Sequence, residues 1–190
     1  MKKTFLIFTI IVIGLNSCGL KEKREKAEQE AKQEAEQKAD VIKSTLTEVG
    51  QKVPEFNYVT LDNDTIHIND LKGKVVFMNF YATSCPICIK ELPFVEKDIW
   101  SKHKNNENFE LIVFGREHTS DQVIAFKEKN EYTFNIVPDP ERKIYSLFAE
   151  RYIPRNVVLD REGNIVYQAT GFDDDEFANL KQTIETELNK

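Results

Sequence analysis

Two cysteines separated by two residues are the part of this sequence best suited to chemistry. They lie in the run Cys85-Pro86-Ile87-Cys88. A thiolate attacks disulfides, and two thiols one helical turn apart can close a disulfide of their own. We therefore predict a redox dithiol in which Cys85 is the nucleophile and Cys88 releases the mixed disulfide. Half of a four-cysteine zinc site, or a structural disulfide, is disfavoured because only one further cysteine, Cys18, exists, and it lies near the N-terminus.

A strand and a helix must hold this pair in place. Residues 75–81 are almost continuously apolar, which is typical of a strand covered on both faces, as in a parallel sheet. After the cysteines, apolar residues recur at helical spacing, at Leu92, Val95 and Ile99. The start of such a helix offers unpaired N–H groups and the positive end of its dipole, so we expect Cys85 to ionise more easily than a free cysteine. Pro86 suits the first helical position, where its missing N–H costs nothing.

The other predicted elements alternate between strand and helix. Pro93 should distort the helix after the cysteines, which we expect to reach about residue 103. Strand, helix, strand, helix implies a right-handed parallel crossover. The predicted elements are a hairpin at 58–68, a strand at 109–114, a helix opened by a capping box at Thr119, an extended piece at 134–137, a helix after Asp139-Pro140 carrying Ile144, Leu147 and Phe148, a hairpin at 156–168 and a helix at 173–188.

The N-terminal part has a different composition. A basic start and a short apolar run predict an export signal, and Leu15-Asn16-Ser17-Cys18 resembles the lipobox of bacterial lipoproteins, in which the cysteine is lipid-modified after cleavage before it. The sequence from Leu20 to about Lys43 is rich in Lys, Glu, Gln and Ala. We predict a signal peptide at 1–17, a lipid-anchored, charged helical spacer at 18–48 and a folded domain at 49–190. An uncleaved signal anchor and a disordered tether are the alternatives.

The length and the net charge of the chain narrow the classes of protein to which it can belong. The chain has 190 residues with 41% hydrophobic composition, which suits one globular domain with extra terminal segments. Its net charge is −6, so no basic surface favours nucleic acid as a partner.

From about residue 49 to the C-terminus, the order of elements resembles the thioredoxin fold. The resemblance also rests on Tyr81-Ala82-Thr83-Ser84-Cys85, on Pro93 and on Ile153-Pro154 just before a strand. It implies an α/β, thioredoxin-like, three-layer fold, with a central mixed sheet flanked by helices, an N-terminal β-hairpin and an inserted helix-strand segment. It further implies that the Ile153-Pro154 peptide is cis and that Pro86, Ile153 and Pro154 contribute to substrate binding.

The chain also resembles the TlpA/ResA-like branch of this fold, in the long separation of Cys85 from Pro154 and in the added hairpin. The members of that branch are envelope-facing thiol-disulfide oxidoreductases. In that branch a glutamate at the position of Glu91 lies near the active site and tunes the thiols. Glu91 lies one turn from Cys88, and a partly buried carboxyl there would have a raised pKa and could exchange a proton with Cys88. A surface glutamate on an amphipathic helix is the alternative.

Two positions depart from the family pattern, and a third is a further candidate for the site. Ser84 stands where the family usually has tryptophan, which makes the rim of the site smaller and more polar. Asn79 replaces the buried aspartate of thioredoxin, so any general-base role would fall to Glu91 or to water. Arg155 is a candidate to stabilise the Cys85 thiolate, with a solvated arginine as the alternative.

Together these features imply a membrane-tethered thiol-disulfide oxidoreductase of the bacterial cell envelope, with its domain on the periplasmic side. We expect it to reduce protein disulfides, to exchange with protein dithiols and to receive electrons from a transmembrane thiol carrier, because an exported protein works in oxidising surroundings. We expect no cofactor beyond the Cys85–Cys88 disulfide. Two other functions stay open. One is a copper-binding or delivery module with His118 as a third ligand. The other is a peroxiredoxin-like peroxidase, although Ala82 stands where that family has a hydroxyl residue.

Overall fold

The computed structural model describes residues 14–190, with side chains from residue 21 onward. The chain divides into two units, one that ends at Ile42 and one that spans Lys43–Lys190. The predicted signal peptide falls largely outside the described residues, and so does the side chain of Cys18. The division into signal peptide, spacer and domain therefore stays a prediction.

Helix α1, Gly14–Ser44, contains the Lys- and Glu-rich segment. Its described side chains are almost all exposed, and oppositely charged residues four positions apart pair along it. Such pairs stabilise a helix that has no apolar face to bury. Within the described residues, no helix combines the length and the apolar character needed to cross a membrane. The ion pairs are Lys21–Glu25, Arg24–Glu28, Lys26–Glu30 and Lys32–Glu36.

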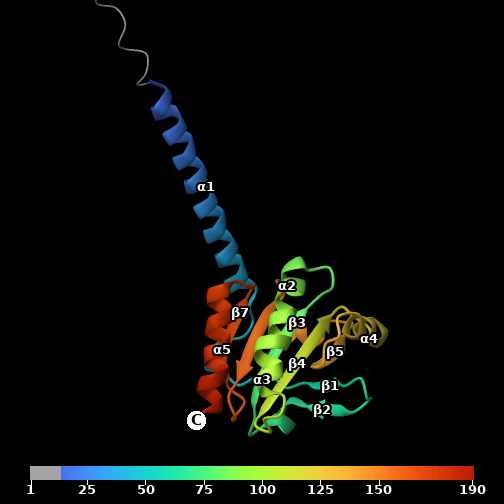
Figure 1. Cartoon of the computed structure of the whole chain (residues 1–190). Helices are drawn as coiled ribbons and strands as arrows, with labels where there is room; N and C mark the ends of the chain where they lie inside the picture. The colour runs from blue at the N-terminus through green and yellow to red at the C-terminus, as the bar shows by residue number, and fades with distance from the viewer. Residues whose placement is uncertain (1–13) are drawn as a thin grey trace, which may run out of the picture. The chain divides into compact units, whose positions relative to one another are not determined.

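The Lys43–Lys190 unit is built on a five-stranded sheet with the strand order β5-β4-β3-β6-β7 (Figure 1). The central strand β3 pairs in parallel with β4, which pairs in parallel with β5. On its other side β3 pairs antiparallel with β6, and β6 pairs antiparallel with β7. The predicted thioredoxin-like mixed sheet is confirmed. Its strands are β3 (Val75–Tyr81), β4 (Phe109–Arg116), β5 (Asn135–Asp139), β6 (Arg155–Leu159) and β7 (Ile165–Thr170).

Different elements cover the two faces of the sheet. Phe77 and Tyr81 of β3 pack in one core cluster with the helices, while Met78 and Phe80 pack in a second cluster beneath the N-terminal hairpin. Every residue of β3 is buried, as its apolar run predicts. The helical layer holds α2 (Pro86–Phe94), η2 (Val95–Trp100), α3 (Ser101–His103), α4 (Ser120–Lys129) and α5 (Asp174–Leu188). The opposite layer holds β1 (Asn57–Val59), β2 (Thr65–His67), η1 (Ile68–Leu71) and η3 (Tyr145–Leu147).

The helix after the dithiol is continuous but irregular, as Pro93 predicts. A proline inside a helix has no N–H to donate and crowds the preceding turn. The N–H of Val95 is shared between the carbonyl oxygens of Glu91 and Leu92, and the six residues of η2 then adopt wider π-helical bonding. Helical structure ends at His103, the expected point.

The prediction of a helix after Asp139-Pro140 is wrong, because only the short 3-10 turn η3 forms there. The Asp139 carboxylate does cap it, accepting the N–H groups of Ile144 (3.2 Å) and Tyr145 (2.8 Å). The rings of Tyr145 and Phe148 are fully buried and lie 5.6 and 5.2 Å from the ring of Phe80. Packing of these two rings on the sheet replaces continuation of the helix.

Candidate active site

Strand β3 and helix α2 place the two cysteines at a strand-to-helix junction. Cys85 is the N-cap residue of α2, and its Sγ accepts the N–H of Cys88 at 3.2 Å. The two residues form a disulfide with their Cα atoms 5.3 Å apart. Cys85 is half-buried, whereas Cys88 is fully buried. The outer sulfur is therefore the one that another molecule can reach, and it sits where a helix start stabilises a thiolate.

Local sequence explains this junction. The N–H of Cys85 donates to the carbonyl oxygen of Ala82 at 3.0 Å, which closes a turn directly after the strand. Pro86 occupies the first helical position, and the N–H of Ile89 donates to the carbonyl oxygen of Cys85 at 3.1 Å. A proline at that position is already set for the helix and leaves no orphaned donor.

The loop before β6 faces the outer sulfur. The Ile153-Pro154 peptide is cis, as expected, and the Ile153 carbonyl oxygen lies 3.7 Å from the Cys85 Sγ. Pro154 is buried and Pro86 is exposed. The structure thus brings Ile153 next to the sulfur, and Pro154 follows it in the same loop. The roles of Ile153, Pro154 and Pro86 in substrate binding stay predictions.

Glu91 lies one turn after Cys88 and is only 1% exposed. Its Oε2 accepts from Asn79 Nδ2 at 2.9 Å, and its Oε1 accepts from Asn156 Nδ2 at 2.6 Å. Asn79 Nδ2 also donates to Asn156 Oδ1 at 2.7 Å. We call these three residues the carboxyl cluster. The alternative of a surface glutamate on an amphipathic helix is wrong.

Burial controls the ionisation of this cluster. Loss of solvent raises the pKa of Glu91 from 4.5 to about 7, while the hydrogen bonds from Asn156 and Asn79 act in the opposite direction. A carboxyl that titrates near neutral pH can hold or release a proton under physiological conditions. The proton exchange predicted between Glu91 and Cys88, one helical turn apart on α2, stays a prediction.

Two residues of β6, Arg155 and Asn156, are placed in a way that the sequence analysis did not predict. Arg155 is only 1% exposed, so it is not solvated, and it lies on the sheet face opposite Asn156 because successive side chains of a strand alternate. Its Nη1 donates to Thr45 Oγ1 at 3.2 Å, and burial lowers its pKa. Asn156 was absent from the predicted site. Its signal is an asparagine directly before the apolar run 157–159, a place where a buried polar side chain needs a partner.

His118 contacts Thr83, two residues before Cys85, and both of its ring nitrogens have hydrogen-bond partners. Its Nδ1 is 2.7 Å from the Arg116 carbonyl oxygen, so Nδ1 carries the proton and donates it. Its Nε2 accepts from the Thr83 N–H at 3.3 Å and lies 2.9 Å from Thr83 Oγ1. Across the described side chains, no group of three His, Cys, Asp or Glu residues is placed to hold a metal ion. This arrangement does not favour copper binding, and the buried Ala82 offers no hydroxyl for a peroxidase.

Several known proteins are similar to this chain in sequence and in fold. The redoxin family model matches residues 48–184. The thiol-disulfide oxidoreductase ResA of Bacillus thuringiensis (strain Al Hakam) is 30% identical over 124 residues, which cover 65% of this chain and 70% of that protein. Another ResA, from Bacillus thuringiensis subsp. konkukian (strain 97-27), is 26% identical over 171 residues, covering 90% of this chain and 91% of that protein.

A solved structure agrees with these similarities. The solution structure of a candidate protein disulfide isomerase from Bacteroides thetaiotaomicron superposes with a TM-score of 0.74 at 37% identity, covering 77% of this chain and 94% of that one. The family match spans the sheet, the dithiol and the carboxyl cluster. The chain therefore belongs to the redoxin family and is a thiol-disulfide oxidoreductase of the ResA type.

Proposed function

We propose that this protein is a membrane-tethered reductase of protein disulfides in the bacterial cell envelope. The observation that carries the proposal is the pairing of a reachable Cys85 sulfur at a helix start with a fully buried Cys88 behind it. The ResA relatives, named as thiol-disulfide oxidoreductases, support the same chemistry.

The reaction proceeds in two exchanges. The Cys85 thiolate attacks one sulfur of a substrate disulfide, whose S–S bond breaks as the Cys85–substrate bond forms, and the other substrate sulfur leaves as a thiolate. The Cys88 thiolate then attacks the Cys85 sulfur, closing the Cys85–Cys88 disulfide and releasing the second substrate thiolate. Two electrons pass from the protein to its substrate. We assign Ile153 and Pro154, whose loop reaches the Cys85 sulfur, and the exposed Pro86 to substrate binding.

Cys88 must lose its proton before the second exchange. Its side chain is buried, so solvent does not take that proton directly. We assign this proton to Glu91, which has a pKa of about 7 and lies one turn away on α2, and which returns it when the disulfide is reduced again. In this role Glu91 is the general base of the resolving step.

The electrostatics support the reducing direction. A dithiol becomes a strong oxidant when its thiolate is strongly stabilised. Here the helix start stabilises the Cys85 thiolate, but Arg155 is directed to the opposite face of the sheet and Lys90 lies 5.6 Å from the ring of Phe172. The buried Glu91 carboxylate opposes a further negative charge nearby. Moderate stabilisation of the thiolate suits a reductase.

The N-terminal segment supports a tether. We assign Cys18 as the lipidated residue, with the domain on the periplasmic side and a transmembrane thiol carrier as electron donor. Helix α1 ends at Ser44, so its part after the proposed cleavage site, residues 18–44, would extend about 40 Å at the usual helical rise. A ResA relative aligns over 171 residues, more than the Lys43–Lys190 unit contains, so the similarity reaches into this segment.

Trapping of the mixed disulfide tests the mechanism. Reduced full-length chain is mixed with insulin, whose interchain disulfides are the probe. Cys88→Ser should accumulate a covalent complex with insulin that dithiothreitol releases, since nothing resolves it, and Cys85→Ser should form none. A complex of equal yield through Cys88 in the Cys85→Ser chain would contradict the assignment of roles.

A further inference from the structure

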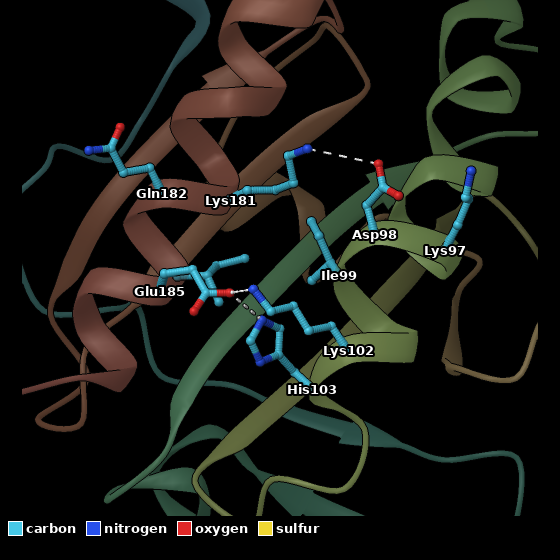
Figure 2. A pocket seen from close by; sticks show the side chains of 9 residues that line it. Lys97, Asp98, Ile99, Lys102, His103, Lys181, Gln182 and Glu185 are labelled. Carbon is cyan, nitrogen blue, oxygen red and sulfur yellow. Dashed lines mark hydrogen bonds and ion pairs between the residues drawn. The ribbon is translucent and has the colours of Figure 1, made fainter.

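A pocket of about 430 Å³ lies between the start of α2 and helix α4. A larger cavity, about 530 Å³, lies between α5 and the segment η2–α3, where charged side chains face one another in ion pairs (Figure 2). The smaller pocket differs because aliphatic and aromatic groups form much of its wall. Its lining includes Thr83, Ile89, His118, Ala125, Phe126 and Lys129.

The base of the pocket is fixed in place by neighbouring contacts. The ring of Phe126 stacks on that of Tyr81 with centroids 4.9 Å apart, and Asn130 Nδ2 donates to the Phe126 carbonyl oxygen at 2.8 Å. His118 is held between Thr83 and Arg116. Because these groups already have partners, a ligand does not have to order them, which lowers the entropic cost of binding.

The pocket adjoins the reactive sulfur along the chain. Thr83 precedes Cys85 by two residues, and Ile89 lies one helical turn after it, about 6 Å along the helix axis. Extended peptide advances about 3.3 Å per residue. A polypeptide whose cysteine meets the Cys85 sulfur therefore brings a side chain one to three residues away within reach of the pocket.

The chemistry of the lining indicates the kind of side chain. Pockets of this size with apolar walls and a few polar groups favour apolar ligands. Ile89, Ala125 and Phe126 supply the apolar surface, while the exposed Lys129 stands at the edge. Ser84, directly before Cys85, is exposed and small and adds little bulk next to the dithiol.

We propose that this pocket binds an aromatic side chain of the substrate polypeptide, one to three residues from the cysteine that Cys85 attacks. The inference rests on the proposed function, since the occupant is the reductase's substrate. The pocket is then a specificity subsite, separate from the Ile153-Pro154 loop, which does not line it.

Short peptides test the subsite on the full-length reduced chain. Each peptide carries one cysteine as a mixed disulfide with thionitrobenzoate, with Phe or Ser two positions before or after it. Attack of Cys85 on the peptide sulfur breaks the S–S bond and releases thionitrobenzoate, whose absorbance gives the rate. In at least one of the two positions, we expect the Phe peptide to react about tenfold faster than its Ser counterpart.

Filling the pocket should remove this preference. Ala125 is exposed on α4, so Ala125→Phe adds its ring to the pocket without disturbing the core, and Ala125→Leu is a smaller filler should the first variant fold poorly. Both pocket-filling variants should react with the Phe peptide no faster than with the Ser peptide. Their rate with either peptide should equal the rate of the wild-type chain with the Ser peptide. Ile124→Phe, one residue away and outside the lining, should keep the tenfold preference.

Equal rates for Phe and Ser peptides in the wild-type chain would overturn the subsite, as would a preference that survives both fillers. The mixed disulfide of glutathione with thionitrobenzoate reports the proposed function separately, since it has no aromatic side chain to place. If the wild-type chain does not react with this small probe at all, the redox function fails and the subsite with it.

Discussion

A buried carboxyl with no cation beside it depends on hydrogen bonds to ionise. Glu91 has two such bonds, one from Asn79 and one from Asn156, and all three side chains are at most 3% exposed. The amides offset part of the cost of burial, so the pKa of Glu91 is about 7, a value at which the group exists in both forms near neutral pH.

Replacing Glu91 with glutamine should flatten the pH dependence of stability of the oxidised protein. The pKa of Glu91 is raised from 4.5 to about 7 by folding, so between these values the unfolded chain has lost a proton that the folded chain keeps. The free energy of unfolding therefore falls as pH rises through this window, by about 3 kcal/mol in total, and the loss is complete above pH 7.

Urea unfolding at pH 4.5 and pH 8 measures this difference. Glu91→Gln should lose less stability than wild type across the interval, whereas Glu107→Gln, a change at an exposed position, should behave as wild type does. A wild-type slope retained in Glu91→Gln would show that another group causes it.

Removing one amide should move the titration of Glu91 upward. In Asn156→Leu the donor to Oε1 is lost, so the ionised carboxylate is less stable and the pKa of Glu91 should rise above about 7, by about one unit. The shift can be read from the carboxyl ¹³C resonance of glutamate-labelled chain, with Glu91→Gln identifying the signal. An unchanged or lower midpoint would mean that Asn156 does not stabilise the ionised form.

The spacing of the cysteines and of Glu91 along one helix was enough to predict that they lie together, because helical geometry is local. The asparagines were harder, since their contacts join β3, α2 and β6, which are far apart in sequence. Asn79 was noted only as a substitution for aspartate. Arg155 was misjudged because the choice of sheet face depends on strand register, which sequence alone leaves open.

Helix α5 contacts the last part of the continuous helix that follows the dithiol, η2 and α3. Lys102 and His103 both reach the Glu185 carboxylate, and Lys181 lies 3.8 Å from Asp98 (Figure 2). The pKa of His103 is lowered, chiefly by burial, so its contact with Glu185 near neutral pH is a hydrogen bond of the neutral ring. These contacts support the position of α2 through the continuous helix.

Truncation of Glu185 should destabilise the domain modestly. Glu185→Ala removes the acceptor of both Lys102 and His103, and because the pair is partly exposed we expect a loss of about 1 kcal/mol. Gln182→Ala, in the same cavity, should change stability by less than about 0.5 kcal/mol. Urea unfolding at pH 7 compares the two, and equal losses would count against a role for the Glu185 contacts.

The order of strands and helices followed from hydrophobic periodicity and turn signals, which is why the sheet and its crossover were predictable. The segment after β5 was the exception. Its apolar spacing suits a helix, but the ring of Tyr145 packs edge-on against Phe80, the ring of Phe148 packs tilted against it, and Asp139 accepts the local backbone N–H groups. Tertiary packing overrode local preference there.

For the chain as a whole, the proposed anchor predicts where the protein is found. Changing Cys18 to serine removes the only lipid attachment point in the proposed arrangement, so the protein should leave the detergent phase in Triton X-114 partitioning of bacteria that express it. The same change should leave the reduction of insulin by purified chain unaltered. A Cys18→Ser chain that still partitions into detergent would refute the lipid anchor and favour an uncleaved signal anchor.

The most direct test of the account is the midpoint potential of the Cys85–Cys88 couple in the full-length chain, titrated against glutathione and dithiothreitol. We predict a reversible two-electron couple at about −270 mV, the range of a reducing thioredoxin, and expect Cys85→Ser to lose this couple. A value of about −120 mV would identify an oxidant that installs disulfides. The absence of any reversible two-electron couple would contradict the assignment of a redox dithiol itself.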